Sequence, residues 1–275
     1  MKKFSIIGIS VLLITLSLIS CHKKETVQVF SSANIIHASP GTASFQVFVD
    51  TMGPINNTTV AYGGSSGYIG LIPGNRNISL ENRATTPKSV YAQFSDNMEA
   101  GKAYTYVVYD TIDAKGFVKV LRLNDNLTLP TVSSAFVRFL DLAIFGGNMD
   151  VTLVRGTQYD TSSTSTQKLV FAPIDSVTIS NQSYIGSSPN ISALSDFKYS
   201  VTGVTGNAIA KSTTLATIPD FYQNNRYIIK LKTAGTQTVL LQSSAVTLLP
   251  GRIYTVFARG TAKGQALAVS VVQNY

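Results

Sequence analysis

Residues 33–50 read ANIIHASPGTASFQVFVD and contain the pattern that decides the fold. Phe45, Val47 and Val49 fall on one face of an extended strand, with Gln46 and Asp50 on the other. The same alternation recurs in residues 104–108 and 267–271. Turn-forming pairs separate such segments, namely Pro73-Gly74, Ala100-Gly101, Asp125-Asn126, Gly146-Gly147 and Pro250-Gly251. This punctuation is typical of an antiparallel β-sandwich.

The composition favours the same fold class. Charged residues make up 13% of the chain, and glutamate occurs only three times. Ser, Thr, Val, Ile, Tyr and Phe dominate, as expected for strands, and no long stretch repeats apolar residues at helical spacing. We therefore predict an all-β protein.

The N-terminus predicts export. Lys2-Lys3 precede an apolar run from Ile6 to Ile19, and this order is typical of a secretory signal peptide. Residues 18–21, Leu-Ile-Ser-Cys, resemble the bacterial lipobox. The resemblance implies a signal peptide over residues 1–20, a diacylglycerol on Cys21 and a lipidated tether over residues 21–31. The alternative, a transmembrane anchor, would need a longer apolar run.

The residue after Cys21 bears on localisation. His22 stands where an aspartate would hold a lipoprotein in the inner membrane, so the common sorting rule implies the outer membrane of the cell envelope. The periplasmic side and the cell surface both stay open. Cys21 is the only cysteine, so we expect no disulfide.

An internal repeat accounts for the length of the chain. At an offset of 104, residues 34–39 align with 138–143 and residues 45–49 with 149–153. The offset then grows to 150, where residues 101–105 align with 251–255. We predict two β-sandwich domains, over residues 32–130 and 131–275, the second with a long insertion around residues 155–224. Each is expected to close its own core, which predicts a monomer.

Several segments resemble a known family. They are Ala33 to Pro40, Phe45 to Asp50, Tyr68 to Gly74 and Ala100 to Thr105, and together they look like domain of unknown function 4397. The second copy departs from the pattern, because Asp141 replaces His37 and no Ser-Pro follows. The resemblance implies an exported β-sandwich of the immunoglobulin or transthyretin-like kind, often in tandem behind a lipobox. It implies no reaction.

The best catalytic candidate in the sequence is His37 with Ser39, which lie two residues apart and would share a strand face, with Asp50 as a possible orienting group. The alternative is that His37 ends the first strand and hydrogen-bonds the turn begun by Ser39-Pro40. Because Asp141 stands at the equivalent position, we favour the structural role and expect no catalytic residue and no enzyme.

We expect no metal and no cofactor. The two histidines are His22 and His37, too few for a typical zinc site. Residues 95–97 and 124–126 each offer one carboxylate, so we interpret them as turns and not as calcium loops. The glycine-rich residues 63–67 lack the Lys-Ser/Thr ending of a phosphate loop. Lysine and arginine are spread along the chain, which argues against a nucleic-acid partner.

Two weaker signals concern the surface. Tyrosines near expected loops could form a binding patch, although tyrosines such as Tyr104, Tyr106, Tyr227 and Tyr254 could equally pack the core. The candidate binding residues are Tyr62, Tyr68, Tyr159, Tyr184 and Tyr222. Three Asp-Ser/Thr-aliphatic triplets resemble the O-glycosylation sequon of Bacteroidetes-type bacteria. Their acceptors are Thr51, Thr111 and Ser176.

These observations favour a non-catalytic, lipid-anchored envelope protein that presents sandwich loops to a protein or a surface polymer. The alternative is an accessory glycan-binding lipoprotein of a polysaccharide-uptake system, in which exposed aromatic and amide groups would bind the sugar.

Overall fold

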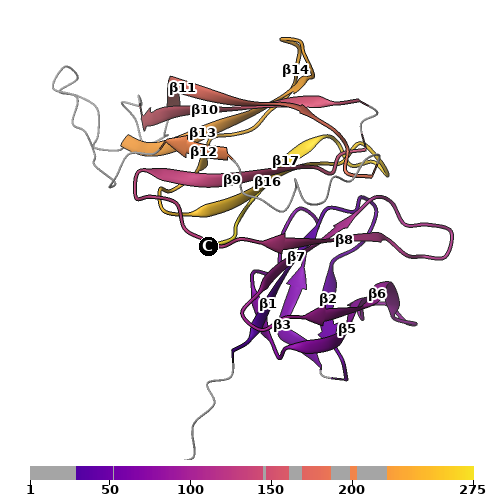
Figure 1. Ribbon diagram of the computed structural model, residues 1–275. Helices are drawn as coiled ribbons and strands as arrows, with labels where there is room; N and C mark the ends of the chain where they lie inside the picture. The colour runs from indigo at the N-terminus through magenta and orange to yellow at the C-terminus, as the bar shows by residue number, and fades with distance from the viewer. Residues whose placement is uncertain (1–28, 52, 145–146, 161–168, 187–198, 203–221) are drawn as a thin grey trace, which may run out of the picture.

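The computed structural model describes residues 29–51, 53–144, 147–160, 169–186, 199–202 and 222–275. Within these ranges the chain forms strands β1 to β17 and no α-helix (Figure 1). The prediction of an all-β protein is therefore confirmed. The predicted signal peptide and Cys21 lie outside the described residues.

The first eight strands form a β-sandwich, here called the N-terminal sandwich. They are β1 (Ser31–His37), β2 (Phe45–Val49), β3 (Pro54–Val60), β4 (Ile69–Leu71), β5 (Gly74–Asn82), β6 (Ser89–Met98), β7 (Ala103–Tyr109) and β8 (Lys119–Asp125). The inner N sheet has the order β4-β1-β7-β8 and the outer N sheet the order β3-β2-β5-β6. β1 and β7 pair in parallel, and the other neighbours are antiparallel.

The remaining strands form the C-terminal sandwich. They are β9 (Ser134–Asp141), β10 (Met149–Asp160), β11 (Leu169–Gln182), β12 (Tyr199–Thr202), β13 (Tyr222–Thr233), β14 (Val239–Gln242), β15 (Val246–Thr247), β16 (Ile253–Arg259) and β17 (Ala268–Gln273). The inner C sheet has the order β12-β9-β16-β17, and the outer C sheet has the order β11-β10-β13-β14, with β15 paired to β13.

The two sandwiches have matching topologies. β9 and β16 pair in parallel, as β1 and β7 do. In each outer sheet, the second strand of the first hairpin lies at the edge, namely β3 beside β2 and β11 beside β10. In this correspondence Asn34 pairs with Thr105, and Arg138 pairs with Thr255. These pairs agree with the sequence offsets of 104 and 150.

The greater length of the second half partly reflects longer strands. β10 has 12 residues and β11 has 14, whereas β2 has five and β3 has seven. Thr157 to Asp160, at the start of the predicted insertion, belong to β10. Their partners in β11 supply the ladder hydrogen bonds.

Each sandwich has an apolar core between its two sheets. Phe45, Leu80 and Tyr106 belong to the first core, and Leu153, Tyr227 and Val256 to the second. Tyr104 and Tyr254 are also buried in these cores, as the packing alternative expected. In both sandwiches a tyrosine hydroxyl accepts a backbone N–H five residues upstream. Tyr104 accepts from Glu99 at 3.1 Å and Tyr254 from Leu249 at 2.8 Å, an arrangement similar to a tyrosine corner.

A third core lies between the sandwiches. Ile36, Val107 and Leu123 of the inner N sheet pack with Leu140 and Phe257 of the inner C sheet. Both inner sheets thus bury both faces, and the four sheets stack as four layers (Figure 1). Each sandwich has its own core, as expected, and this third core, which the sequence did not predict, joins the two.

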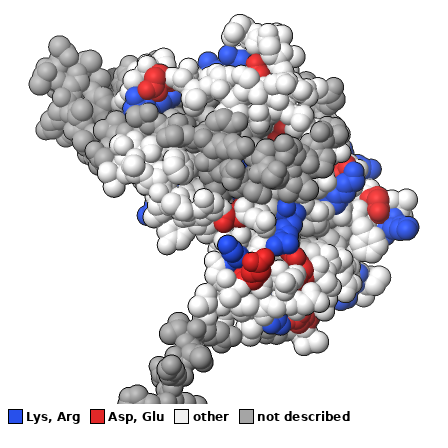
Figure 2. All heavy atoms as spheres, in the orientation of Figure 1, with Lys and Arg blue, Asp and Glu red and all other residues white. Residues whose placement is uncertain are grey.

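No helix among the described residues is long and apolar enough to cross a membrane. On the face shown in Figure 2, lysine and arginine side chains lie close to aspartate and glutamate. Among the ion pairs of the described residues, one joins Lys119 to Asp110 at 2.8 Å, and another joins Arg122 to Asp96 at 3.1 Å.

Candidate functional site

His37 lies at the end of β1, where its fully buried ring contacts the following turn. The Thr42 hydroxyl donates to the Ser39 carbonyl, so His37 Nε2–H donates to Thr42 Oγ1 at 3.0 Å and Ala43 O at 3.3 Å. This assigns the proton to Nε2. Burial lowers the pKa of His37 to about 4, so the ring is neutral at physiological pH.

The three residues considered for a catalytic triad have separate structural partners. Ser39 Oγ donates to the Asp110 carbonyl at 2.5 Å. The Asp50 carboxylate accepts from Arg76 Nη1 and from the Asn77 backbone N–H, both at 2.9 Å. The contacts of His37 with its turn agree with the structural role that the sequence favoured.

Asp141 occupies the corresponding position at the end of β9 and is also buried. Its Oδ1 accepts the Ala143 N–H at 3.1 Å, and its backbone carbonyl accepts the Ile185 N–H at 2.9 Å. Burial raises the pKa of Asp141 to about 7. His37 and Asp141 therefore share an environment that disfavours charge, although one is a base and the other an acid.

A buried polar network joins the inner sheets. Arg138 Nη1 donates to Asp125 Oδ1 at 2.6 Å, and only 2% and 0% of these side chains are exposed. Asp125 also accepts from the Thr105 and Tyr68 hydroxyls at 2.5 Å each. Arg138 Nη2 donates to Thr255 Oγ1 at 2.9 Å. The pair thus crosses from one sandwich to the other within the shared core.

The network is only partly symmetric. Thr255 donates to Asn274 at 2.7 Å, as Thr105 donates to Asp125. Asn34 stands opposite Thr105 in the strand register, as Arg138 stands opposite Thr255. No hydrogen-bond partner is found for the Asn34 amide atoms among the described residues. Arg138 therefore forms an ion pair, whereas the equivalent position in the N-terminal sandwich holds the neutral side chain of Asn34.

Tyr62 and Tyr184, which were predicted as ligand-binding residues, each contact a side chain of the other sandwich. The Arg259 guanidinium lies 4.5 Å from the centre of the Tyr62 ring. The Tyr184 ring lies 6.5 Å from the Tyr109 ring in an edge-on arrangement. Each loop is fixed beside its inner sheet, since Gly63 N–H donates to the His37 carbonyl at 2.7 Å and Ile185 N–H to that of Asp141 at 2.9 Å.

Tyr68 also lies at the interface, where its hydroxyl accepts from Asn274 Nδ2 of the C-terminal sandwich at 3.4 Å. Tyr68 donates to Asp125 within the shared network, and burial followed by the Asp125 charge raises its pKa. Tyr159 and Tyr222 face each other in the register of β10 and β13. Their side chains lie outside the described part of the structure.

The three glycosylation candidates lie apart. Thr51 is exposed in the turn after β2, Thr111 is half-buried after β7, and Ser176 is exposed on β11. The neighbouring Asp175 forms an ion pair with Arg155 at 2.5 Å. Modification of these hydroxyls stays a prediction.

The suggested calcium segments are not turns. Residues 95–97 lie within β6, and Asp125 ends β8, so the turn interpretation of both segments is wrong. Asp96 accepts from the Tyr106 hydroxyl at 2.5 Å, and Asp125 pairs with Arg138. Among the described residues no group of three or more His, Cys, Asp and Glu side chains could hold a metal ion.

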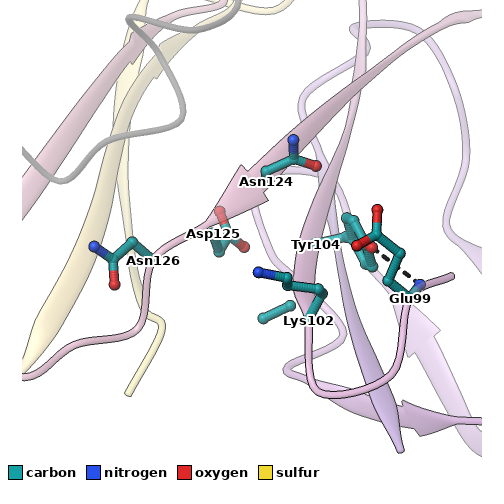
Figure 3. Close-up of a pocket in the computed structure, with 7 residues that line it drawn as sticks. Glu99, Lys102, Tyr104, Asn124, Asp125 and Asn126 are labelled. Carbon is teal, nitrogen blue, oxygen red and sulfur yellow. Dashed lines mark hydrogen bonds between the residues drawn. The ribbon is translucent and has the colours of Figure 1, made fainter.

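A polar cavity of about 320 Å³ opens where β7 begins and β8 ends (Figure 3). The Lys102 amine extends over the cavity toward Asp125 and Asn126, with Glu99 on the opposite side (Figure 3). Its lining consists of Glu99, Lys102, Ala103, Tyr104, Asn124, Asp125 and Asn126. Amide, amine and carboxylate groups suit hydrogen bonding to a polar ligand. The lining contains no hydroxyl nucleophile paired with a base.

Sequence reasoning missed this cavity and the interface. Glu99 and Lys102 flank the predicted Ala100-Gly101 turn, so their proximity was available as a local signal. The interface also had a signal, because β1, β7 and β16 are buried along nearly their whole length. Strands covered on both faces read as continuous apolar runs.

The architecture defines an all-β protein built from two sandwiches, with a polar cavity where β7 begins and β8 ends. Comparison with protein families gives a match over residues 31–152 to the model described as "Domain of unknown function (DUF4397)". The chain therefore contains a domain of this family. The match covers the N-terminal sandwich and continues through β9 into β10. No curated protein matches the chain.

Proposed function

We propose that this protein is a non-catalytic lipoprotein of the bacterial cell envelope, anchored through Cys21 to the outer membrane, that presents β-sandwich surfaces to a protein or a surface polymer. The second sandwich would be a divergent copy of the family domain. The matching strand orders and the sequence offsets support this relation. The signal peptide and lipobox-like residues 18–21 support export and anchoring.

The shared core is the observation that carries this proposal. A third apolar cluster and the buried Arg138–Asp125 pair join the sandwiches across their inner sheets. Binding surfaces are effective when a rigid framework positions them. The four-layer body would hold the loops of both sandwiches in one fixed arrangement.

The structural use of the reactive side chains supports a binding role over a catalytic one. His37 is held neutral by burial and bonded to its own turn. Ser39 and Asp50 each bond elsewhere. Catalysis would require a nucleophile and a base in contact with each other.

The polar cavity favours a second candidate, an accessory glycan-binding lipoprotein of a polysaccharide-uptake system. Asn124, Asn126 and Lys102 supply donors, and Glu99 supplies acceptors, at one opening. Sugar hydroxyls bind to such mixed sets of groups. The volume of about 320 Å³ lies at the lower end of the range for small-molecule sites.

The test is binding of the mature chain from Lys23 to Tyr275 to a panel of bacterial, host and plant polysaccharides by calorimetry. Saturable binding that Asn126→Ala and Lys102→Ala abolish would support the glycan candidate. Lys115→Ala, in the exposed β7–β8 hairpin, is the matched control and is expected to leave binding unchanged.

If no polysaccharide binds, cross-linking in intact cells tests the first candidate. A specific envelope protein recovered with the lipidated chain would support presentation to a protein partner. Turnover of a substrate by the mature chain would contradict both candidates.

A further inference from the structure

Large apolar side chains are exposed where the chain enters the N-terminal sandwich. Val29 and Phe30 precede β1, and each is 53% exposed. Ile72, which follows β4, is 45% exposed. Ser31 pairs with Leu71 in an antiparallel ladder, and its hydroxyl donates to the Leu71 carbonyl at 3.0 Å. The register therefore places Phe30 opposite Ile72. Val29, Phe30 and Ile72 are called the anchor-side patch.

An apolar cavity of about 350 Å³ lies beside this patch. Leu71 and Ile72 form part of its wall, together with Pro54 and Ile55 of β3. The cavity extends the apolar surface from the patch into the side of the sandwich. Its lining is Val49, Gly53, Pro54, Ile55, Gly70, Leu71, Ile72 and Arg76.

Near the patch, Arg76 is paired with Asp50, and exposed Glu99 and Lys102 flank the turn that contacts Phe30. Arg76, at the cavity wall, is held by the Ile72 and Pro73 carbonyls at 2.8 Å and by Asp50 at 2.9 Å. Lys102 is exposed next to β1, since the Ser32 N–H donates to its carbonyl at 2.9 Å. In the sequence, Lys23 and Lys24 precede the patch. Exposed lysines around apolar side chains attract the headgroups of anionic lipids.

We propose that the anchor-side patch rests on the lipid bilayer, with Val29, Phe30 and Ile72 at the boundary between headgroups and acyl chains. This inference rests on the proposed lipid anchor at Cys21. Eight peptide units separate Cys21 from Val29, so the chain between them spans at most about 29 Å. Val29 and Phe30 are the first described residues after the proposed anchor, and a short tether would keep the patch near the membrane.

This orientation determines which surfaces face outward. β7 runs parallel to β1, so the β7–β8 hairpin with Phe117 lies at the opposite end of the inner N sheet. That end points away from the bilayer and is available to soluble partners. The polar cavity beside Lys102 lies at the headgroup level, within reach of polymers attached to the membrane.

The test uses the lipidated full chain, reconstituted in phosphatidylethanolamine–phosphatidylglycerol vesicles. Cys21 is the only cysteine in the sequence, and the proposed diacylglycerol would block its sulfur as a thioether, so an introduced cysteine would be the single reactive thiol. Ile72→Cys is labelled with an environment-sensitive fluorophore, and Phe117→Cys, also exposed (42%), is the matched control. We expect a blue shift of the label at position 72 and quenching by spin-labelled lipid, with neither change at position 117.

Equal, water-like emission from both positions would overturn the proposal. A blue shift at position 72 that depends on protein concentration and not on vesicles would also overturn it, because it would assign the patch to contacts between copies. Mass spectrometry first establishes whether Cys21 is acylated. If it is not, lipid anchoring fails independently, and a His-tagged mature chain on nickel-chelating lipid tests the patch alone.

Discussion

The two sandwiches share one topology but differ in their polar residues. At the end of the first strand, His37 of the N-terminal sandwich corresponds to Asp141 of the C-terminal sandwich. In the middle of that strand, Asn34 corresponds to Arg138. The neighbouring residues of both strands, such as Ile36 in β1 and Leu140 in β9, are apolar and buried. The comparison teaches that the fold requires burial at these positions, and that chemistry there can vary as long as the group is neutral or paired.

The largest expected effect comes from the buried ion pair. Arg138→Ala leaves Asp125 without its charged partner in the shared core, and we expect a loss of about 3–5 kcal/mol in the free energy of unfolding. Urea denaturation measures this loss. The corresponding Asn34→Ala should cost much less, because the Asn34 amide has no partner among the described residues. Equal losses would contradict the assigned asymmetry.

Because the pKa of Asp141 is raised in the folded protein, we expect the free energy of unfolding to fall as pH increases. The unfolded carboxyl releases its proton near pH 3.8, whereas the folded one keeps it until about pH 7. Between these values the folded state binds more protons, so stability decreases with increasing pH, by up to about 4 kcal/mol. Asp141→Asn should remove this slope. Unfolding curves between pH 4 and 8 test the prediction, and an unchanged slope in the variant would contradict it.

Because the pKa of His37 is lowered in the folded protein, its contribution to the free energy of unfolding changes with pH in the opposite direction. The unfolded ring takes up a proton near pH 6.5, and the folded ring only near pH 4. Stability therefore decreases as pH falls from 6.5 to 4, by up to about 3 kcal/mol. His37→Gln should remove this acid-side loss and leave the slope caused by Asp141 in place. NMR titration of the His37 ring gives an independent check, and a folded-state pKa near 6.5 would refute the account.

The smallest expected effect concerns the contacts at the ends of the inner strands. Arg259→Met removes the cation over the Tyr62 ring, and we expect a loss of about 1 kcal/mol. Arg252→Met, at an exposed position, is the control and should change stability little. Thermal unfolding of both variants provides the measurement. If Arg252→Met lowers the stability as much as Arg259→Met or more, the contact between Arg259 and the Tyr62 ring makes no specific contribution.

Much of the strand architecture could be predicted from the sequence. Phe45, Val47 and Val49 are buried on β2 as their alternation indicated. Gly101 and Gly251 adopt positive φ angles of 72° and 73° in the predicted turns. The candidate site could not be predicted in the same way. Lys102 and Asn126 meet at one cavity only because β7 and β8 pair, which brings their ends together.

The sequence by itself determined the fold class and the family resemblance of the N-terminal part, because alternation, turn residues and short motifs act over a few neighbouring residues. Tertiary structure alone decided that the two sandwiches share a core. Ile36 and Leu140 would suit a solvent-facing sheet poorly, yet nothing local specifies that they face each other. Tertiary structure also decided that Arg138 pairs with Asp125, because a buried charge takes its partner from whichever element the packing brings within hydrogen-bond distance.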